Sequence, residues 1–414
     1  MRLTIERLGQ MGDGIAQGPE GPVFAPLTLP GEVVEGDIVN GRIGTPRIIT
    51  PSIDRVRPPC SHFRACGGCS VQHASDSFVE TWKADVVRSA LSARDLPAPI
   101  RNVHTSPAQS RRRAVLAGKR TKSGAMIGFH ARGSDTLIEV PNCQLLQPQI
   151  VALFPALQDL TIIGASRKAE LSLTVTWSDA GADIAVQGGK PLDGPLRLDL
   201  AAFINKHNVA RLTWADDLVG QNRPPIHVIE GISVSPPPGA FLQATNDGEH
   251  ALIAAVIEAI GPAKHVADLF AGCGTFALPL ARTAEVHAVE SVAEMLTALD
   301  VGWRNARGLK KVTTEKRDLF RRPMVPLELR HFDAVVLDPP RAGAEAQIEQ
   351  IVDSIVPRIA MVSCNPITFA RDAELLCSAG YVINWIDVVD QFRWSGHVEL
   401  VAQFTKPHMS KKSR

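Results

Sequence analysis

Two residues of this sequence, Cys364 and Glu399, have side chains and positions that suit covalent chemistry. Cys364 follows the apolar run Met361-Val362-Ser363, about 26 residues after Asp338-Pro339-Pro340-Arg341, and Asn365-Pro366 then turns the chain. A thiolate near the N-terminus of a following helix has a lowered pKa and is a strong nucleophile. Free cysteines are also commonly inert core residues, so these residues alone leave both roles open.

Glu399 lies in the segment Gly396-His397-Val398-Glu399-Leu400-Val401, near the end of the chain. It alternates with apolar neighbours, which is the pattern of a strand with one solvated face. A carboxylate beside a cysteine nucleophile suits a general base, although the alternation alone also fits an ordinary exposed strand residue. The sequence therefore predicts Cys364 as a candidate nucleophile and Glu399 as a candidate base at neighbouring strand ends.

A third motif, Asp268-Leu269-Phe270-Ala271-Gly272-Cys273-Gly274-Thr275, predicts a strand, a glycine turn and the start of a helix. Gly272 and Gly274 let a ligand approach the backbone because they carry no Cβ. The third glycine of the dinucleotide fingerprint is absent, so a pyrophosphate is not the expected ligand. Glu290 ends the next predicted strand, 16 residues after Gly274, where a carboxylate can accept both ribose hydroxyls. These features predict an adenosyl ligand without a diphosphate, above all S-adenosylmethionine.

The cysteines suggest a metal site as well as a nucleophile. The chain has seven, and Cys60, Cys66 and Cys69 form a C-x5-C-x2-C run with a distant fourth cysteine. In a reducing cytosol, clustered thiols indicate metal binding or catalysis more often than disulfides. Zinc accepts four thiolates, but a zinc ribbon has two C-x2-C pairs. Four thiolates also suit a [4Fe–4S] cluster, and unliganded thiols remain an alternative.

Composition limits the class of protein. The chain has 414 residues, of which 45% are hydrophobic and 21% charged, as in soluble globular proteins with two or three domains. A net charge of +1 excludes a uniformly basic surface, so any phosphate contact must use a local patch. The densest basic stretch comprises Arg111, Arg112, Arg113, Lys119, Arg120 and Lys122. Such a run is either a solvated face or a phosphate-binding surface. Without a secretory signal or an apolar membrane span, we expect a cytoplasmic protein.

The elements that must position these residues fall into three regions. Residues 1–56 carry short alternating runs between turns, which predict a small β-barrel of the kind that binds oligonucleotides. Residues 57–238 have a mixed pattern that includes a helix near 77–93, and the stiff segment Ser235-Pro236-Pro237-Pro238-Gly239 marks a boundary. Residues 239–414 alternate strands with helices and end in a basic tail, 406–414, that we expect to fray.

The third region predicts a parallel sheet that helices bury on both faces. The expected strands are 266–270, 286–290, 333–338 and 359–363, the helices between and after them 277–281, 292–305, 344–355 and 368–379, and the closing hairpin 382–389 with 398–404. In an open α/β sheet, ligands bind outside the carboxyl ends of the strands. The glycine loop and Cys364 are therefore expected to meet in one crevice.

These motifs resemble those of the S-adenosylmethionine-dependent RNA uridine C5-methyltransferases, and most of all the iron–sulfur 23S rRNA (uracil-5-)-methyltransferases. The resemblance covers nearly the whole chain. Its most specific part is Ser363-Cys364-Asn365-Pro366 followed by His397-Val398-Glu399. It implies an α/β fold: a TRAM/OB-like RNA-binding barrel (1–56), a central α+β domain with the iron–sulfur site (57–238) and a Rossmann-like class I methyltransferase domain (239–414).

By this resemblance, Cys364 adds to uracil C6, the methyl group of S-adenosylmethionine moves to C5, and Glu399 removes the C5 proton. The implied cluster ligands are Cys60, Cys66, Cys69 and Cys143. The cofactor positions, including Gly272 of the glycine turn, are Gln243, Phe270, Gly272, Glu290, Asp318 and Asp338. The chain departs from the family pattern at Arg393-Trp394-Ser395-Gly396, where Pro-His-Thr is usual, and at Ala244-Thr245, where Val-Asn is common.

The resemblance implies RNA as the partner, with ribosomal RNA favoured and the T-loop uridine of transfer RNA as the alternative. A second alternative is a non-catalytic iron–sulfur protein that binds ribosomal RNA during assembly. Methylation of adenine N6 is disfavoured because an aromatic residue would then follow Asp-Pro-Pro, where this chain has Arg341. We expect a monomer.

Overall fold

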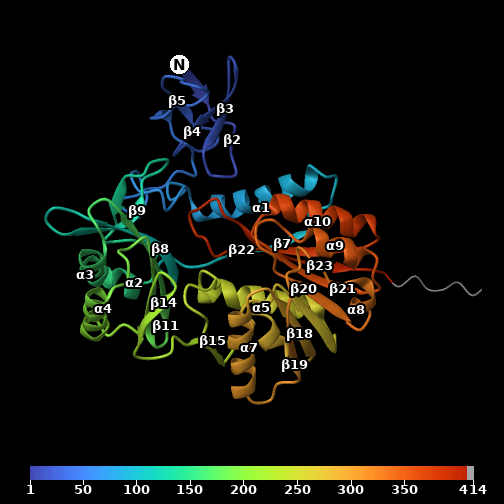
Figure 1. The fold of residues 1–414 in the computed structure, drawn as a ribbon. Helices are drawn as coiled ribbons and strands as arrows, with labels where there is room; N and C mark the ends of the chain where they lie inside the picture. Colours follow the sequence, from blue (N-terminus) through green and yellow to red (C-terminus); the bar gives the residue numbers. More distant parts are fainter. Residues whose placement is uncertain (408–414) are drawn as a thin grey trace, which may run out of the picture.

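The computed structural model describes residues 1–407, so most of the basic tail expected at 406–414 lies outside the described part. The N-terminal residues form two antiparallel sheets of three strands, β1–β5–β6 and β2–β3–β4, at the top of Figure 1. Their strands are β1 (Arg2–Thr4), β2 (Arg7–Leu8), β3 (Gly14–Gly18), β4 (Gly21–Ala25), β5 (Val33–Glu35) and β6 (Arg47–Thr50). Ile5, Val23, Val34 and Ile43 share one small core. The short strands expected between turns are therefore present.

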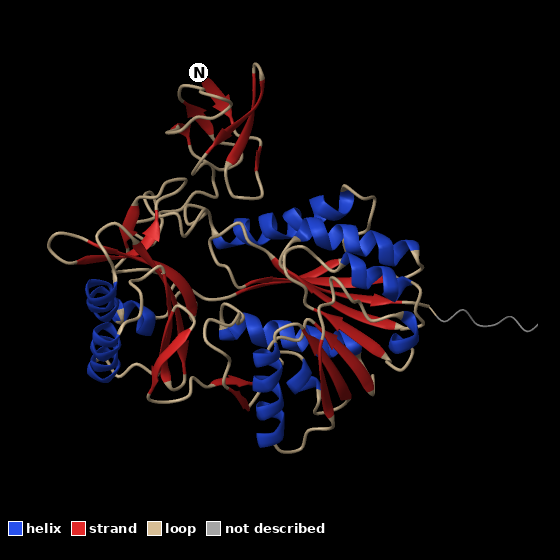
Figure 2. Ribbon diagram, viewed as in Figure 1, coloured by secondary structure: helices blue, strands red, loops and turns tan. Residues whose placement is uncertain are grey.

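The central region contains a seven-stranded sheet with the order β10–β9–β8–β11–β12–β13–β14. Its strands are β8 (Arg113–Arg120), β9 (Ala125–His130), β10 (Leu137–Glu139), β11 (Glu170–Ser178), β12 (Gly181–Gln187), β13 (Arg211–Trp214) and β14 (Asp217–Gln221). Helices α2 (Pro148–Ala152), α3 (Phe154–Gly164) and α4 (Gly194–Lys206) accompany it, and α3 and α4 lie along its outer face in Figure 2. Leu171, Leu173 and Val175 alternate along β11 and are buried. A hairpin of β15 (His227–Ile229) and β16 (Ile232–Val234) follows.

The C-terminal region is built on an eight-stranded sheet with the order β19–β18–β17–β20–β21–β23–β22–β7. Its strands are β7 (Ile100–Thr105), β17 (His265–Leu269), β18 (Glu285–Glu290), β19 (Val312–Lys316), β20 (Ala334–Leu337), β21 (Arg358–Ser363), β22 (Val382–Asp390) and β23 (Glu399–Thr405). Every neighbouring pair is parallel except those formed by β23, which is antiparallel to both β21 and β22. The predicted parallel sheet with a closing hairpin is confirmed.

Helices cover both faces of this sheet, as Figure 2 shows. One core packs α5 (Asn246–Ile260), α6 (Ala277–Leu280) and α7 (Ala293–Asn305) against it. The other packs α1 (Asp76–Ser92), α8 (Pro326–Leu329), α9 (Glu345–Val352) and α10 (Pro366–Ser378). All four residues of β20 are buried, which explains the continuous apolar run in the sequence.

Two elements from the expected central region belong to the C-terminal sheet. β7 pairs with β22 at the sheet edge, and α1 packs beside α10. β7 has the sequence IRNVHT, whose polar residues suit an edge strand. Because it lacks a continuous apolar run, the pattern that indicates a buried strand does not identify it. β19, at the opposite edge, escaped the prediction for the same reason, since VTTEK is mostly polar.

None of the helices within residues 1–407 is long and apolar enough to cross a membrane.

Candidate active site

Cys364 lies directly after β21 and before α10, at the carboxyl edge of the eight-stranded sheet. Antiparallel pairing sets Ser363 opposite Leu400, so the next step along the two strands brings Cys364 beside Glu399. Because β23 runs opposite to β21, its first residue reaches the edge at which the parallel strands end. The structure thus brings the two sequence-predicted residues together.

The environment of Cys364 is not the one expected from the sequence. Burial, together with the carboxyls of Glu399 and Asp338, raises the pKa of the Cys364 thiol to about 11, and Arg341 opposes this rise. The expectation of a lowered pKa at the N-terminus of a helix is therefore wrong. Asn365 accepts the hydrogen bond from a first-turn amide of α10 with its own side chain, and burial beside two carboxyls outweighs the field of the helix.

Glu399 is 2% exposed, so it is a buried carboxyl and not a solvated strand residue. Burial and the nearby Asp338 raise the pKa of Glu399, and a hydrogen bond from Gln391 opposes them. Nε2 of Gln391 donates to Oε2 of Glu399 at 2.6 Å and to Oε1 of Gln243 at 2.5 Å. The backbone amide of Ala244 donates to Oε1 of Gln391 at 2.7 Å. One amide side chain therefore fixes both Glu399 and Gln243.

The glycine loop between β17 and α6 lies at the same edge of the sheet. Gly272 has φ +55° and a Cβ there would meet no atom within 4 Å, whereas a Cβ on Gly274 (φ +91°) would lie 2.8 Å from Leu299. The backbone amide of Gly272 donates to Oε2 of Glu290 at 3.1 Å. Oε1 of Glu290 accepts from the backbone amides at the start of α7. Glu290 therefore joins the loop to the next helix, and Gly272 leaves open space beside it.

Two other predicted cofactor positions flank this loop. Phe270 has φ +64° and its ring lies 5.5 Å from that of Phe320. Asp318 is exposed and its Oδ1 accepts from the backbone amide of Phe320 at 3.0 Å. Asp318 thus shapes the turn after β19 that places Phe320 against Phe270.

Asp338 connects the loop with the nucleophile. Burial raises the pKa of Asp338, and its charge in turn raises the pKa values of Glu399, Cys364 and Asp268. Asp268 is fully buried, neither of its oxygens has a close hydrogen-bond partner, and burial raises its pKa well above the ordinary value. Burial and the charge of Asp338 thus favour the protonated form of Asp268, and the backbone of Ala277 opposes them. Four acidic groups therefore converge at the carboxyl edge of the sheet.

Sequence reasoning did not identify Gln391 or Asp268 as site residues. Asp268 had a signal, because it is the next-to-last residue of the strand that leads into the glycine loop. For Gln391 the sequence carries no signal beyond its place after the long strand β22. Its partners are Glu399 of β23 and Gln243 in the segment before α5, and both lie apart from it in the sequence.

The four cysteines of the predicted metal site lie close enough for their charges to interact, and none of them forms a disulfide. Cys66 and Cys69 are buried, and burial raises the pKa of Cys69 to about 12. A Cβ on Gly67 would lie 2.8 Å from the carbonyl oxygen of His130, so the segment wraps tightly. Within residues 1–407, no three cysteine, histidine or acidic side chains converge closely enough to hold a single metal ion.

The basic stretch is divided between the interior and the surface. Arg112 is 3% exposed and its guanidinium bonds Glu249 of α5 at 2.6 Å and the carbonyl oxygen of Gln243 at 3.1 Å. Arg112 therefore belongs neither to a solvated face nor to a phosphate-binding surface, because its guanidinium is buried and paired with a carboxylate. Lys119 and Lys122 are exposed and remain candidates for phosphate contact.

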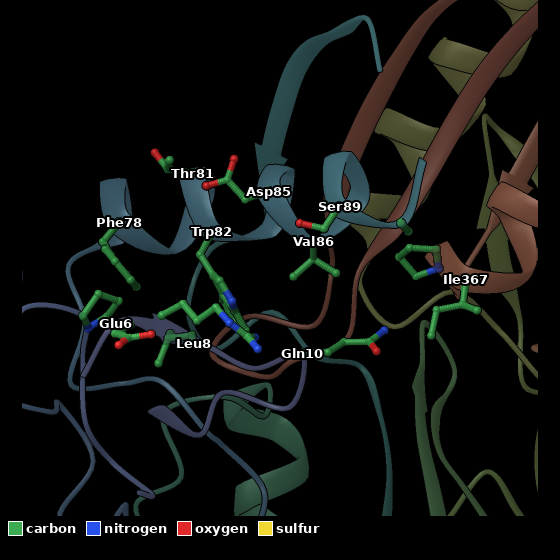
Figure 3. A pocket seen from close by; sticks show the side chains of 14 residues that line it. Glu6, Leu8, Gln10, Phe78, Thr81, Trp82, Asp85, Val86, Ser89 and Ile367 are labelled. Atoms are coloured by element: carbon green, nitrogen blue, oxygen red, sulfur yellow. The ribbon is translucent and has the colours of Figure 1, made fainter. Parts of the chain in front are cut away.

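A groove lies between the N-terminal strands, α1 and the start of α10 (Figure 3). Its volume is about 530 Å³, and Phe78, Trp82 and Val86 point from α1 toward Leu8. Its far end reaches Ile367, three residues after Cys364. A larger cavity of about 910 Å³ lies between the central sheet and α5, with Arg112 in its lining.

Comparisons with known proteins identify the family of this chain. Residues 235–406 match the family model of tRNA (uracil-5-)-methyltransferases. An uncharacterized RNA methyltransferase of Rhizobium meliloti is 43% identical over 98% of this chain and 99% of its own length. The 23S rRNA (uracil(1939)-C(5))-methyltransferase RlmD of Cronobacter sakazakii is 32% identical over 98% and 96%.

One solved structure shares the fold over nearly the full chain. The Pyrococcus abyssi tRNA (uracil-54, C5)-methyltransferase, solved in complex with S-adenosyl-L-homocysteine, superimposes with a TM-score of 0.76 at 20% identity, covering 98% of this chain and 100% of that one. Family model, full-length relatives and fold agree. The chain belongs to the S-adenosylmethionine-dependent RNA (uracil-5-)-methyltransferase family.

Proposed function

We propose that this enzyme methylates C5 of a specific uridine in 23S ribosomal RNA, with Cys364 as nucleophile and Glu399 as base. The observation that carries the proposal is the pairing of β21 with β23, which puts the thiol and the buried carboxyl side by side at the edge that also bears the glycine loop. The Cronobacter relative, whose name specifies 23S rRNA, favours the ribosomal substrate.

The proposed reaction divides a difficult substitution into easier steps. The Cys364 sulfur bonds to C6 of the uracil ring, which makes C5 nucleophilic. S-adenosylmethionine supplies the methyl group that C5 accepts. The Glu399 carboxylate then takes the C5 proton, the C5–C6 double bond returns, and the C6–S bond breaks. Gln391 holds Glu399 for this last step through its 2.6 Å hydrogen bond.

The residues at the glycine loop fit an adenosyl ligand. Gly272 leaves space where any other side chain would project, and Glu290 is held with a carboxylate beside that space. Gln243, Phe270, Asp318 and Asp338 would complete the site. The target uridine must leave its stack to reach Cys364, at a cost of a few kcal/mol that is least in a loop.

We further propose that Cys60, Cys66, Cys69 and Cys143 hold a [4Fe–4S] cluster with a structural role. Four neighbouring thiols without a disulfide, two of them buried and two partly buried, suit such a group, and the guanidinium of Arg111 lies near Cys69 and Cys143 as a countercharge. Iron and sulfide analysis of anaerobically purified protein tests this, with Cys377→Ser as a control that leaves the cluster cysteines intact.

The three regions have matching roles in this proposal. Residues 1–56 form the TRAM-like barrel that contacts RNA, residues 57–238 supply the cluster, and residues 239–414 supply the methyltransferase site. The groove between the barrel and α1 ends three residues from Cys364, which suits an RNA strand that crosses both.

Transfer RNA is the second candidate substrate, because the family model that matches residues 235–406 is named for it. The chemistry would be the same with a T-loop uridine as target. Mapping 5-methyluridine in ribosomal and transfer RNA from cells that lack this protein distinguishes the two substrates.

The chemistry is tested with RNA that contains 5-fluorouridine. Fluorine at C5 cannot be removed as a proton is, so the covalent adduct persists through denaturation. We expect the parent enzyme with S-adenosylmethionine to form this adduct and the Cys364→Ser variant to form none. A Cys364→Ser variant that methylates uridine as fast as the parent would refute the proposal, and binding without any adduct would favour the non-catalytic assembly factor.

A further inference from the structure

The segment Asp390–His397 begins with the last residue of β22 and forms the loop toward β23, and parts of the chain that lie far away in sequence contact it. The carbonyl oxygen of Trp394 accepts from the backbone amides of Ser70 (2.6 Å) and Val71 (3.1 Å), which follow the cysteine run. A Cβ on Gly396 would lie 2.4 Å from the carbonyl oxygen of Gln10 in the N-terminal region. The loop is therefore a junction between the methyltransferase sheet and the segments before it.

Lys83 of α1 forms hydrogen bonds with both ends of this loop. Its side chain is fully buried, and its Nζ donates to Oδ1 of Asp390 and to the carbonyl oxygens of Phe392 (3.2 Å) and His397 (2.9 Å). An ammonium group has three protons, and these three acceptors use all of them. The acceptors stand near the beginning and at the end of the loop, so one side chain fixes both ends.

The conformation that Lys83 holds is strained. Trp394 has φ +61°, a left-handed backbone that is unfavourable for a bulky residue and persists only where the surroundings enforce it. The loop also carries Gln391, whose amide bonds Glu399 and Gln243. A loop that relaxed around Trp394 would therefore move the side chain that orients Glu399.

We propose that Lys83 is a positioning residue for the deprotonation step, acting through Gln391 on Glu399. The inference rests on the proposed function. In that step the C5–H bond breaks and its proton moves to the Glu399 carboxylate. The electron pair forms the C5–C6 double bond, and the C6–S pair returns to the sulfur of Cys364. Lys83 touches neither substrate nor cofactor, so RNA binding and thiol addition do not require it.

The test compares Lys83→Met with Arg211→Met. Arg211 and Asp183 form a buried ion pair of similar kind, at 2.6 and 2.8 Å, on strands of the central sheet that do not include the loop. Both changes leave a buried carboxylate without its partner, so both report the general cost of breaking such a pair. The double variant Lys83→Met/Asp390→Leu also removes the Asp390 carboxylate that would otherwise be buried without a partner. It replaces Lys83→Met in the test if the single variant does not fold.

For Lys83→Met we expect kcat to fall about 100-fold, as for a displaced catalytic group, with KM for RNA unchanged. Ordinary uridine RNA should accumulate as a methylated covalent adduct on denaturing gels, because release is slow. Arg211→Met should keep kcat per folded molecule and accumulate no adduct.

Two outcomes separate this inference from the proposed function. If Lys83→Met and Arg211→Met lose the same activity, or if neither accumulates adduct, the inference is overturned while the function stands. If the parent enzyme forms no adduct even with 5-fluorouridine RNA, the proposed function falls and takes the inference with it.

Discussion

At the residue scale, burial determines the protonation state of the site. Burial raises the pKa values of Cys364, Glu399 and Asp338, the charge of Asp338 also raises those of Glu399 and Cys364, and the charge of Glu399 raises that of Cys364. The resting site therefore holds protons that the proposed chemistry must move. The sequence predicted all three as site residues, but it could not show their burial, which depends on strands that are distant in sequence.

The proposed base makes a specific prediction for Glu399→Gln. Glutamine keeps the size of the side chain and can still bond Gln391, but it cannot accept the C5 proton. General base catalysis contributes about 10²–10⁴-fold, so kcat should fall by that amount. Single-turnover assays should still show methyl transfer, with the product trapped on Cys364 in ordinary uridine RNA. Rapid release of 5-methyluridine RNA from this variant would contradict the assigned role.

The raised pKa of Glu399 also makes the fold sensitive to pH. Above its ordinary value of 4.5, the unfolded chain has released the proton while the folded chain still binds it, so rising pH lowers the free energy of unfolding. Each pKa unit between the two states is worth about 1.4 kcal/mol. Glu399→Gln should therefore gain stability relative to the parent as pH rises toward neutral. Denaturant unfolding of both proteins across this range measures the difference, and parallel curves would exclude the buried carboxyl as the cause.

At the element scale, the site exists because one strand runs against the others. A parallel β23 would place Glu399 at the opposite edge of the sheet, away from Cys364. The sequence predicted the hairpin of β22 and β23, but the meeting of these two residues depends on the register of β23 against β21, which the sequence did not show. It did not predict β7 or β19, since edge strands are polar enough to look like loops.

The glycine loop offers a prediction at the same scale. Gly272→Ala adds a Cβ that points into the open space beside Glu290, in a backbone conformation that disfavours it by about 1–2 kcal/mol. We expect weaker binding of S-adenosylhomocysteine by calorimetry. Gly308→Ala is the matched control, because Gly308 also has positive φ (+74°) and open surroundings but lies after α7. Equal affinities of the two variants would show that Gly272 does not border the cofactor.

At the scale of the whole molecule, buried polar contacts join the central region to the C-terminal region near the site. Arg112 connects the start of β8 to α5 through Glu249, and Lys83 connects α1 to the loop before β23. Sequence reasoning placed Arg112 in a run that is either solvated or phosphate-binding, because a run of cations does not reveal which one has a carboxylate partner from a segment more than a hundred residues away. Only the folded structure distinguishes a buried ion-pair residue from a residue of an RNA-binding surface.

The two roles predict different responses to salt. Arg112→Met leaves Glu249 buried without its partner, so it should destabilise the fold by about 3–5 kcal/mol. The slope of log K for RNA against log salt concentration should stay that of the parent, because the substitution removes no cation from the RNA surface. Lys119→Gln/Lys122→Gln removes two exposed cations and should leave stability intact, while the slope should fall by about one for each phosphate that is no longer neutralised. Fluorescence anisotropy at several salt concentrations measures both slopes. A reduced slope for Arg112→Met, with stability unchanged, would show that Arg112 contacts RNA and that its ion pair with Glu249 does not stabilise the fold.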